Sequence, residues 1–81
     1  MWNDRLRIAE SLESDWKSLS FSERETALAA LQRIDDDPIA GAPLFEPLKG
    51  LWSHRSGEVR IIYKIVAEAS IVVILSITRA S

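Results

Sequence analysis

Hydrophobic and charged residues alternate at the start of the chain and then change period. In the run DRLRIA at residues 4–9, leucine and isoleucine alternate with two arginines, which predicts a short strand with one buried face. Beyond this run, Leu12, Trp16 and Leu19 are spaced four and three residues apart, so they would line one side of a helix. The first twenty residues therefore predict a strand followed by a helix.

A second helix is predicted to begin just after Ser20. Ser20 and Glu23 have the spacing of a capping box, in which each side chain accepts a hydrogen bond from the other residue's backbone amide. The helix should end near residues 35–38, because Pro38 disfavours a helical conformation at the residue before it, and three aspartates are unfavourable at the negative end of a helix dipole. The expected apolar stripe of this helix has four large members: Phe21, Leu28, Leu31 and Ile34. Two small residues, Ala27 and Ala30, would let a neighbouring element approach closely.

The second half of the chain is predicted to form an ordered loop and three strands. Prolines and glycines mark residues 38–50 as the loop. Three runs rich in β-branched and aromatic residues follow, separated by short turns: residues 51–55, 58–66 and 70–78. Because the helices are grouped rather than alternating with the strands, we predict an α+β fold. The expected order over residues 1–81, as a single domain, is β-α-α-β-β-β, with a two-helix hairpin on one face of an antiparallel four-stranded sheet.

Alternation along the strands predicts which side chains point away from the helices. One face of the middle strand is uniformly apolar and suited to the core: Val59, Ile61, Tyr63 and Ile65. Its other face mixes cations with aliphatic residues: Arg60, Ile62, Lys64 and Val66. Strict alternation divides the last strand into two partly apolar sets: Ile71, Val73, Leu75 and Ile77, then Val72, Ile74, Ser76 and Thr78. We therefore expect another chain, or the turns and the C-terminus, to cover part of the helix-free face.

Composition narrows the function classes without selecting one. The 81 residues include no cysteine, so disulfides and thiolate metal sites are excluded, and the aspartates at residues 35–37 lack the pattern of a calcium loop, so no metal site is expected. The charged N-terminus and the short apolar runs predict no secretory signal and no membrane span, with the cytoplasm as the default location. The net charge is −2, yet residues 49–81 hold five of the ten Lys and Arg residues and only two of the twelve Asp and Glu residues. The chain thus has an acidic first part and a basic second part.

The basic residues gather in the hairpin at residues 48–65. Its five candidate cations are Lys49, His54, Arg55, Arg60 and Lys64. Interspersed with aliphatic residues on the helix-free face, they would form a shallow basic depression suited to phosphate or to an acidic partner segment. The alternative is a half-solvated sheet face on which lysine and arginine stems shield apolar neighbours. The pattern of residues leaves both interpretations open.

The run DDDPIAGAPLFEPLKGLWSHRSGEVRIIYKI at residues 35–65, followed by IVVILSITR at residues 71–79, resembles the RelE/ParE superfamily of toxins from bacterial toxin–antitoxin pairs. The likeness lies in the Pro-Leu element, in the spacing GLW..R.G..R..Y, and in a final hydrophobic strand that ends with a basic residue. The resemblance implies the layout β-α-α-β-β-β. It also implies a toxin that a cognate antitoxin holds inactive.

The resemblance implies one of two activities. RelE-like members are ribosome-dependent mRNA endonucleases that work without metal or cofactor and use the message's own 2′-hydroxyl as nucleophile, whereas ParE-like members inhibit DNA gyrase. For the nuclease, the matched positions imply that Arg60 stabilises the scissile phosphate and that Arg55 holds a neighbouring one. Arg79 is expected as a further catalytic residue, and Lys49 and Lys64 as further phosphate-binding residues. The imidazole of His54 would titrate near neutral pH as a base or an acid.

Each candidate has a structural alternative. Arg60 would pair with Glu58 or Glu68, His54 would pack in the structure or face a partner, Lys49 would be solvated, and Arg79 would contact only the terminal carboxylate or a partner. The C-terminus also departs from the RelE pattern, because Ala80 stands where a second basic residue is expected and the final tyrosine is absent. A gyrase inhibitor without nuclease chemistry, and a non-toxic member that only binds the antitoxin, therefore remain alternatives.

Overall fold

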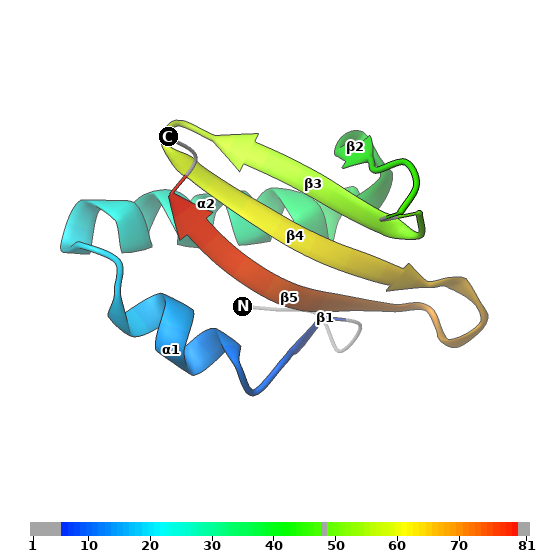
Figure 1. Ribbon diagram of the computed structural model, residues 1–81, viewed down its shortest axis with the longest axis horizontal. Helices are drawn as coiled ribbons and strands as arrows, with labels where there is room; N and C mark the ends of the chain where they lie inside the picture. The colour runs from blue at the N-terminus through cyan, green and yellow to red at the C-terminus, as the bar shows by residue number, and fades with distance from the viewer. Residues whose placement is uncertain (1–5, 48, 80–81) are drawn as a thin grey trace.

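The computed structural model describes residues 6–47 and 49–79, and Figure 1 shows the arrangement of its elements. The elements are β1 (Leu6–Ile8), α1 (Leu12–Lys17), α2 (Phe21–Asp36), a 3₁₀ turn η1 (Pro38–Ala40), β2 (Ala42–Pro43), β3 (Leu51–Ser56), β4 (Val59–Val66), a 3₁₀ turn η2 (Ala67–Ala69) and β5 (Ile71–Arg79). The predicted order of a strand, two helices and three long strands is confirmed. Residues 4 and 5 of the predicted first strand, and Ala80, lie outside the described residues.

The sheet differs from the prediction in two respects. It has five strands in the order β1-β5-β4-β3-β2, because Ala42 and Pro43 pair with Ser53 and Trp52 at the far edge. It is also mixed rather than antiparallel, since β1 pairs with β5 in the parallel direction. Two-residue β2 carries no alternating pattern, and its proline cannot donate to a ladder, so this edge strand has no sequence signature. The direction of β1 depends on how the two helices return the chain to the sheet.

The capping box predicted at the start of α2 is present. The Ser20 hydroxyl accepts a hydrogen bond from the Glu23 amide at 3.2 Å, and Glu23 Oε1 accepts one from the Ser20 amide at 2.7 Å. Two of the four predicted stripe residues are exposed, however: Phe21 at 76% and Leu28 at 45%. At 100° per residue, these two lie on the flank of a face that is centred on the buried Ala27 and Ala30. The small alanines bring α2 close to β3 and β4.

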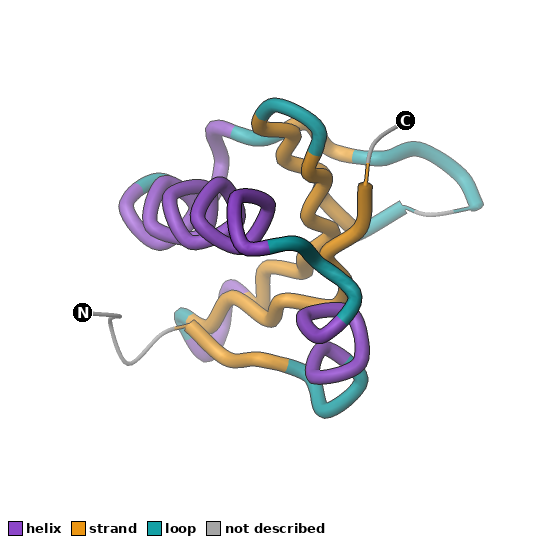
Figure 2. The backbone as a smooth tube through the Cα atoms, turned by 90° about the vertical axis from the view of Figure 1, so that its left-hand side faces the viewer, coloured by secondary structure: helices purple, strands orange, loops and turns teal. Residues whose placement is uncertain are grey.

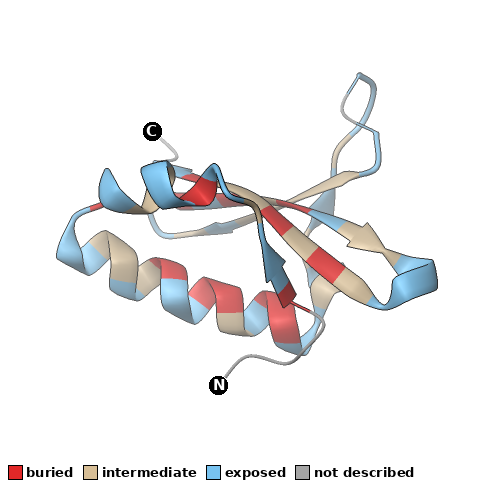
Figure 3. Ribbon diagram, turned by 90° about the horizontal axis from the view of Figure 1, so that it is seen from below, coloured by how far each residue is buried: buried red, intermediate tan, exposed pale blue. Residues whose placement is uncertain are grey.

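The core lies between α2 and one face of the sheet. Val59, Ile61 and Tyr63 of β4 are buried as predicted, whereas Ile65 is only half-buried. Figure 3 shows the buried residues of α2 on the side that faces the strands. On β5 the predicted alternation is wrong, because a bulge interrupts the pairing between Ile62 and Tyr63 of β4 and leaves Leu75 outside the register. The buried β5 residues therefore come from both predicted sets: Val72, Ile74 and Ile77.

Helix α1 packs against β5, whereas α2 covers β3 and β4. Strand β1 ends at Ile8, opposite Ile74, so the remaining length of β5 has an unpaired edge. Asp15 of α1 compensates there, since its Oδ2 accepts a hydrogen bond from the Ile77 amide at 3.1 Å. The contact satisfies a backbone donor that would otherwise be exposed on a sheet edge.

The turn after α2 is fastened to the sheet by Tyr63. The side chain of Tyr63 is fully buried, and its hydroxyl donates a hydrogen bond to the Pro38 carbonyl. Gly41 packs so closely against that hydroxyl that an added Cβ would overlap it and would also lie 2.8 Å from the Ser53 carbonyl oxygen. Burial raises the pKa of the Tyr63 phenol. These contacts hold the start of the loop at residues 38–50 against β3 and β4.

Candidate functional site

The face of the sheet opposite α2 carries three of the predicted basic residues. Arg60 and Lys64 of β4 alternate with the buried residues of that strand and are exposed. The register of β3 places Arg55 directly opposite Arg60, and Leu51 directly opposite Lys64. Since α2 covers the other face, these side chains share the face that no helix covers. We call this surface the open face.

Arg55 and Arg60 form a pair of like charges near the turn that joins β3 to β4. Residues directly opposite on antiparallel strands have Cβ atoms about 4.5–5.5 Å apart, and like charges at that separation destabilise a sheet. Arg55 Nε donates a long hydrogen bond of 3.4 Å to the Gly57 carbonyl in the turn between the strands. Within residues 6–47 and 49–79, Arg60 forms no ion pair with Glu58 or Glu68, the acids that the structural alternative would need. The pair places two positive charges directly opposite each other on the open face.

Lysines extend the charge along the open face. Lys64 lies four residues beyond Arg60 on β4, about 13 Å away at the rise of an extended strand. Lys49 is exposed in the loop just before β3, two residues from the Leu51–Lys64 pair. Half-buried Ile62 lies between the two ends of this row. The result is a cationic strip over a partly apolar floor, which can bind phosphodiesters through charge and hydrogen bonds.

His54 does not lie on the open face. It stands opposite the fully buried Ile61, so it points to the side of the sheet that α2 covers. Burial and the positive charge of Arg33 lower the pKa of the imidazole, and its buried Nε2 has no hydrogen-bond partner among the described residues. His54 is therefore held on the helix side in its neutral form near pH 7.

Arg79 also lies apart from the open face. It pairs with the buried Val59 across β4 and β5, and its guanidinium turns toward the corner between the helices. Its Nε donates to Glu23 Oε2 at 2.7 Å, and its Nη2 donates to the Ser18 carbonyl at 2.7 Å. Hydrogen bonds from the Arg79 side chain and the Ser20 amide lower the pKa of Glu23 to about 2, and the same carboxylate raises the pKa of Arg79. In this conformation Arg79 joins the end of β5 to the capping box of α2.

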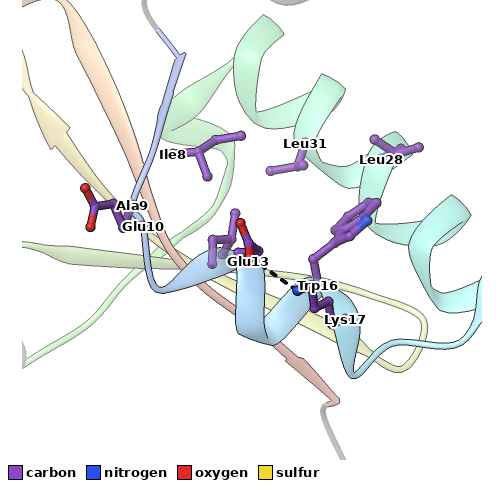
Figure 4. A pocket seen from close by; sticks show the side chains of 9 residues that line it. Ile8, Ala9, Glu10, Glu13, Trp16, Lys17, Leu28 and Leu31 are labelled. Carbon is purple, nitrogen blue, oxygen red and sulfur yellow. Dashed lines mark ion pairs between the residues drawn. The ribbon is translucent and has the colours of Figure 1, made fainter.

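An apolar groove on the opposite edge was not predicted. It is an open hollow of about 440 Å³ between β1, α1 and α2, and Figure 4 shows the side chains that line it. Its apolar lining comes from all three elements: Ile8, Leu12, Trp16, Leu28 and Leu31. An ion pair at 3.3 Å between Lys17 and Glu13 lies on its rim. The signal was present in the sequence as part of the apolar stripes, but a stripe does not show which members remain uncovered.

Residues 6–47 and 49–79 contain neither a metal-binding cluster nor a membrane-spanning helix. No three histidine, aspartate or glutamate side chains there are grouped closely enough to hold a metal ion. None of the helices in the same ranges is long and apolar enough to cross a membrane.

Comparison with known proteins gives matches at the level of structure. Neither a protein-family model nor a curated protein matches the sequence. The RelBE2 toxin–antitoxin complex from Mycobacterium tuberculosis contains a chain that is 28% identical, with a TM-score of 0.84, over 91% of this chain and 94% of that one. The isolated RelE toxin of E. coli matches at 20% identity and a TM-score of 0.76, over 94% of this chain and 83% of that one.

A third structure, the archaeal RelE–RelB complex from Pyrococcus horikoshii, matches at 18% identity and a TM-score of 0.73, over 95% of this chain and 94% of that one. The bacterial and archaeal likenesses under 25% identity establish a shared fold. The mycobacterial chain adds sequence similarity over nearly the whole length of both proteins. With this fold and this similarity, the chain is a member of the RelE/ParE superfamily.

Proposed function

We propose that this protein is the toxin of a type II toxin–antitoxin pair and that it acts as a RelE-like, ribosome-dependent mRNA endonuclease in the cytoplasm. The observation that carries the proposal is the Arg55–Arg60 pair on the open face, continued by Lys64. Cleavage by a 2′-hydroxyl concentrates negative charge on the phosphorus oxygens. Fixed guanidinium groups stabilise such charge, because they need no reorganisation as it develops.

Roles within the site follow from position. Arg60 would donate to the scissile phosphate, while Arg55 and Lys64 would hold its neighbours along the strand. In the reaction the 2′-oxygen forms a bond to phosphorus, its proton passes to a base, and the leaving 5′-oxygen takes up a proton. His54 would take part only if it left the helix side of the sheet, and Arg79 only if its ion pair with Glu23 opened.

The antitoxin partner is supported by the apolar groove. The mycobacterial and archaeal neighbours are toxin–antitoxin complexes, and the E. coli toxin has also been seen with its antitoxin. We propose that an apolar segment of the cognate antitoxin covers the groove around Trp16 and Leu28. Burying exposed apolar surface in this way would give a partner both affinity and specificity.

The experiment is induced expression with RNA mapping. Wild-type protein should arrest growth and produce cuts within translated messages, and co-expression of the neighbouring antitoxin frame should prevent both. Arg60→Ala should restore growth and leave messages intact. Arg7→Ala, which removes an exposed arginine from β1, is the matched control and should remain toxic. Growth arrest with intact messages would rule out the nuclease activity.

A second candidate function is inhibition of DNA gyrase. The observation in its favour is that the paired residues of β3 and β4 on the open face include no histidine, aspartate or glutamate to remove a proton, since His54 lies on the other side. A binding module needs no such group. Purified protein should then block supercoiling by gyrase and induce a DNA-damage response, and unaffected supercoiling would exclude this activity. A non-toxic member that only binds the antitoxin would neither arrest growth nor block supercoiling.

A further inference from the structure

The loop between β2 and β3 carries an exposed aromatic residue. The Leu44 amide donates to the Leu51 carbonyl at 2.9 Å, where the chain enters the loop. Phe45 follows immediately and is 84% exposed, the highest value among the exposed large hydrophobic residues of the described chain. The ring of Phe45 is therefore accessible to a binding partner.

The loop lies on the same side of the sheet as the basic strip. In Figure 2 the helix α2 lies on one side of the strands and the loop lies on the other, and Figure 3 shows the loop projecting away from α2. The base of the loop is fastened by the pairing of Ala42 with Ser53 and by the Tyr63 hydroxyl on the Pro38 carbonyl. The loop that carries Phe45 thus lies on the side of the open face, and its base is held in place.

Positive charge accompanies the aromatic ring. Lys49 belongs to the same loop, and Lys64 lies opposite Leu51, where the loop joins β3. The Arg55–Arg60 pair lies about 13 Å farther along the strands. The loop also carries one carboxylate, that of Glu46, next to the ring.

We propose that Phe45 is a stacking platform for one base of a single-stranded RNA whose phosphates lie along Lys49, Lys64 and the Arg55–Arg60 pair. This inference rests on the proposed function and adds a base-binding residue to it. Aromatic stacking accepts any base, because every base presents a π face, while the cations hold the backbone beside it. The adjoining row of cations favours a polyanion over an apolar protein segment as the occupant.

The test measures binding of a fluorescent oligoribonucleotide of roughly eight nucleotides to the purified protein. Phe45→Ala should weaken binding about tenfold, Phe45→Trp should bind at least as tightly as wild type, and Phe45→Leu should behave like alanine, because leucine keeps the apolar volume but not the π face. Phe21→Ala is the matched control: Phe21 is 76% exposed on α2, away from the strip, and its loss should leave affinity unchanged.

An abasic oligonucleotide of the same length separates stacking from charge. The effect of Phe45→Ala should disappear with this probe, whereas the effect of Arg60→Ala should persist with both probes. Unchanged RNA affinity in Phe45→Ala, together with weakened binding in Arg60→Ala, would overturn the inference and leave the proposed function standing. A wild-type protein that binds neither probe would overturn the inference, whereas the proposed ribosome-dependent function is tested separately by the expression experiment. Loss of antitoxin affinity without loss of RNA affinity in Phe45→Ala would also overturn the inference and assign the ring to a protein contact.

Discussion

Arg55 of β3 and Arg60 of β4 stand directly opposite each other on the face of the sheet that α2 leaves uncovered. Two guanidinium groups directly opposite each other on neighbouring strands oppose folding and favour an anionic ligand. The same geometry therefore predicts opposite effects of one substitution on stability and on binding.

Replacing Arg60 with glutamine should stabilise the protein by about 0.2–1 kcal/mol, because it removes one member of a like-charge pair. Urea denaturation at low salt measures this change, and added salt should reduce it. The control is Arg7→Gln on the exposed side of β1, where no gain is expected. A loss of stability in Arg60→Gln would mean that Arg60 is held by a favourable contact and is not poised for a ligand.

The Glu23–Arg79 contact should make stability depend on acid. The folded-state pKa of Glu23 is about 2, below the value of a free carboxyl group near 4.3, so the contact stabilises the fold above about pH 4.3 and loses its effect as the pH falls toward 2. In urea denaturation, Glu23→Gln should therefore have a lower midpoint concentration than wild type at pH 6. The difference in midpoint between variant and wild type should be smaller at pH 2.

The exposed neighbour Glu25 supplies the control for that experiment, since Glu25→Gln should leave the pH profile of stability parallel to wild type. Identical profiles for Glu23→Gln and wild type between pH 2 and pH 6 would show that the ion pair adds nothing to the fold. Glu23→Gln also weakens one half of the capping box. A part of the lost stability should therefore remain at pH 2, because it comes from the N-terminus of α2.

Leu28→Glu tests the antitoxin groove. Leu28 is 45% exposed, so the substitution should change the free energy of unfolding by less than about 1 kcal/mol, while a buried charge in the complex should weaken antitoxin binding at least about tenfold. Isothermal titration with the antitoxin measures the affinity. Phe21→Glu, on the same helix but outside the groove lining, should bind normally. An equal loss of antitoxin affinity in Leu28→Glu and Phe21→Glu would indicate that the antitoxin binds elsewhere.

Gly41→Ala should destabilise the fold by roughly 1–3 kcal/mol, because the new methyl group overlaps the Tyr63 hydroxyl and approaches the Ser53 carbonyl. Ala40→Ser, at the exposed preceding residue, is the control. Because Gly41 lies where the loop meets the sheet, the variant should also loosen the loop that carries Phe45. Wild-type stability in Gly41→Ala would show that Tyr63 can shift without cost.

Local patterns predicted the elements well, because capping and strand propensity act over a few residues. The Ser20–Glu23 box and the three long strands are examples. The bulge at Leu75 was not predictable, since both faces of β5 are apolar and alternation alone could not show where the register breaks. The partner of Arg79 was also inaccessible from the sequence, because Glu23 lies 56 residues away and meets it only through the fold.

The position of His54 could have been predicted. Once the tight turn at Gly57 and Glu58 places Ser56 opposite Val59, counting back along β3 puts Arg55 opposite Arg60 and His54 opposite the core residue Ile61. The resemblance grouped His54 with Arg60 by their closeness in sequence, whereas the pleat separates them onto two faces. The superfamily assignment itself, which rested on spacing over residues 35–79, is confirmed by the structural comparison.

The most direct test of the open face as the RNA-binding surface is the salt dependence of oligoribonucleotide binding. It is measured for wild type, Arg60→Ala and Arg79→Ala. Each lost phosphate contact should reduce the slope of log affinity against log salt by about 0.7 for a single strand. Arg60→Ala should show this reduction and Arg79→Ala should keep the wild-type slope, because Arg79 is engaged by Glu23 and Ser18 on the other side of the molecule. An unchanged slope for Arg60→Ala, with a reduced slope for Arg79→Ala, would contradict the assignment of the open face as the RNA-binding surface.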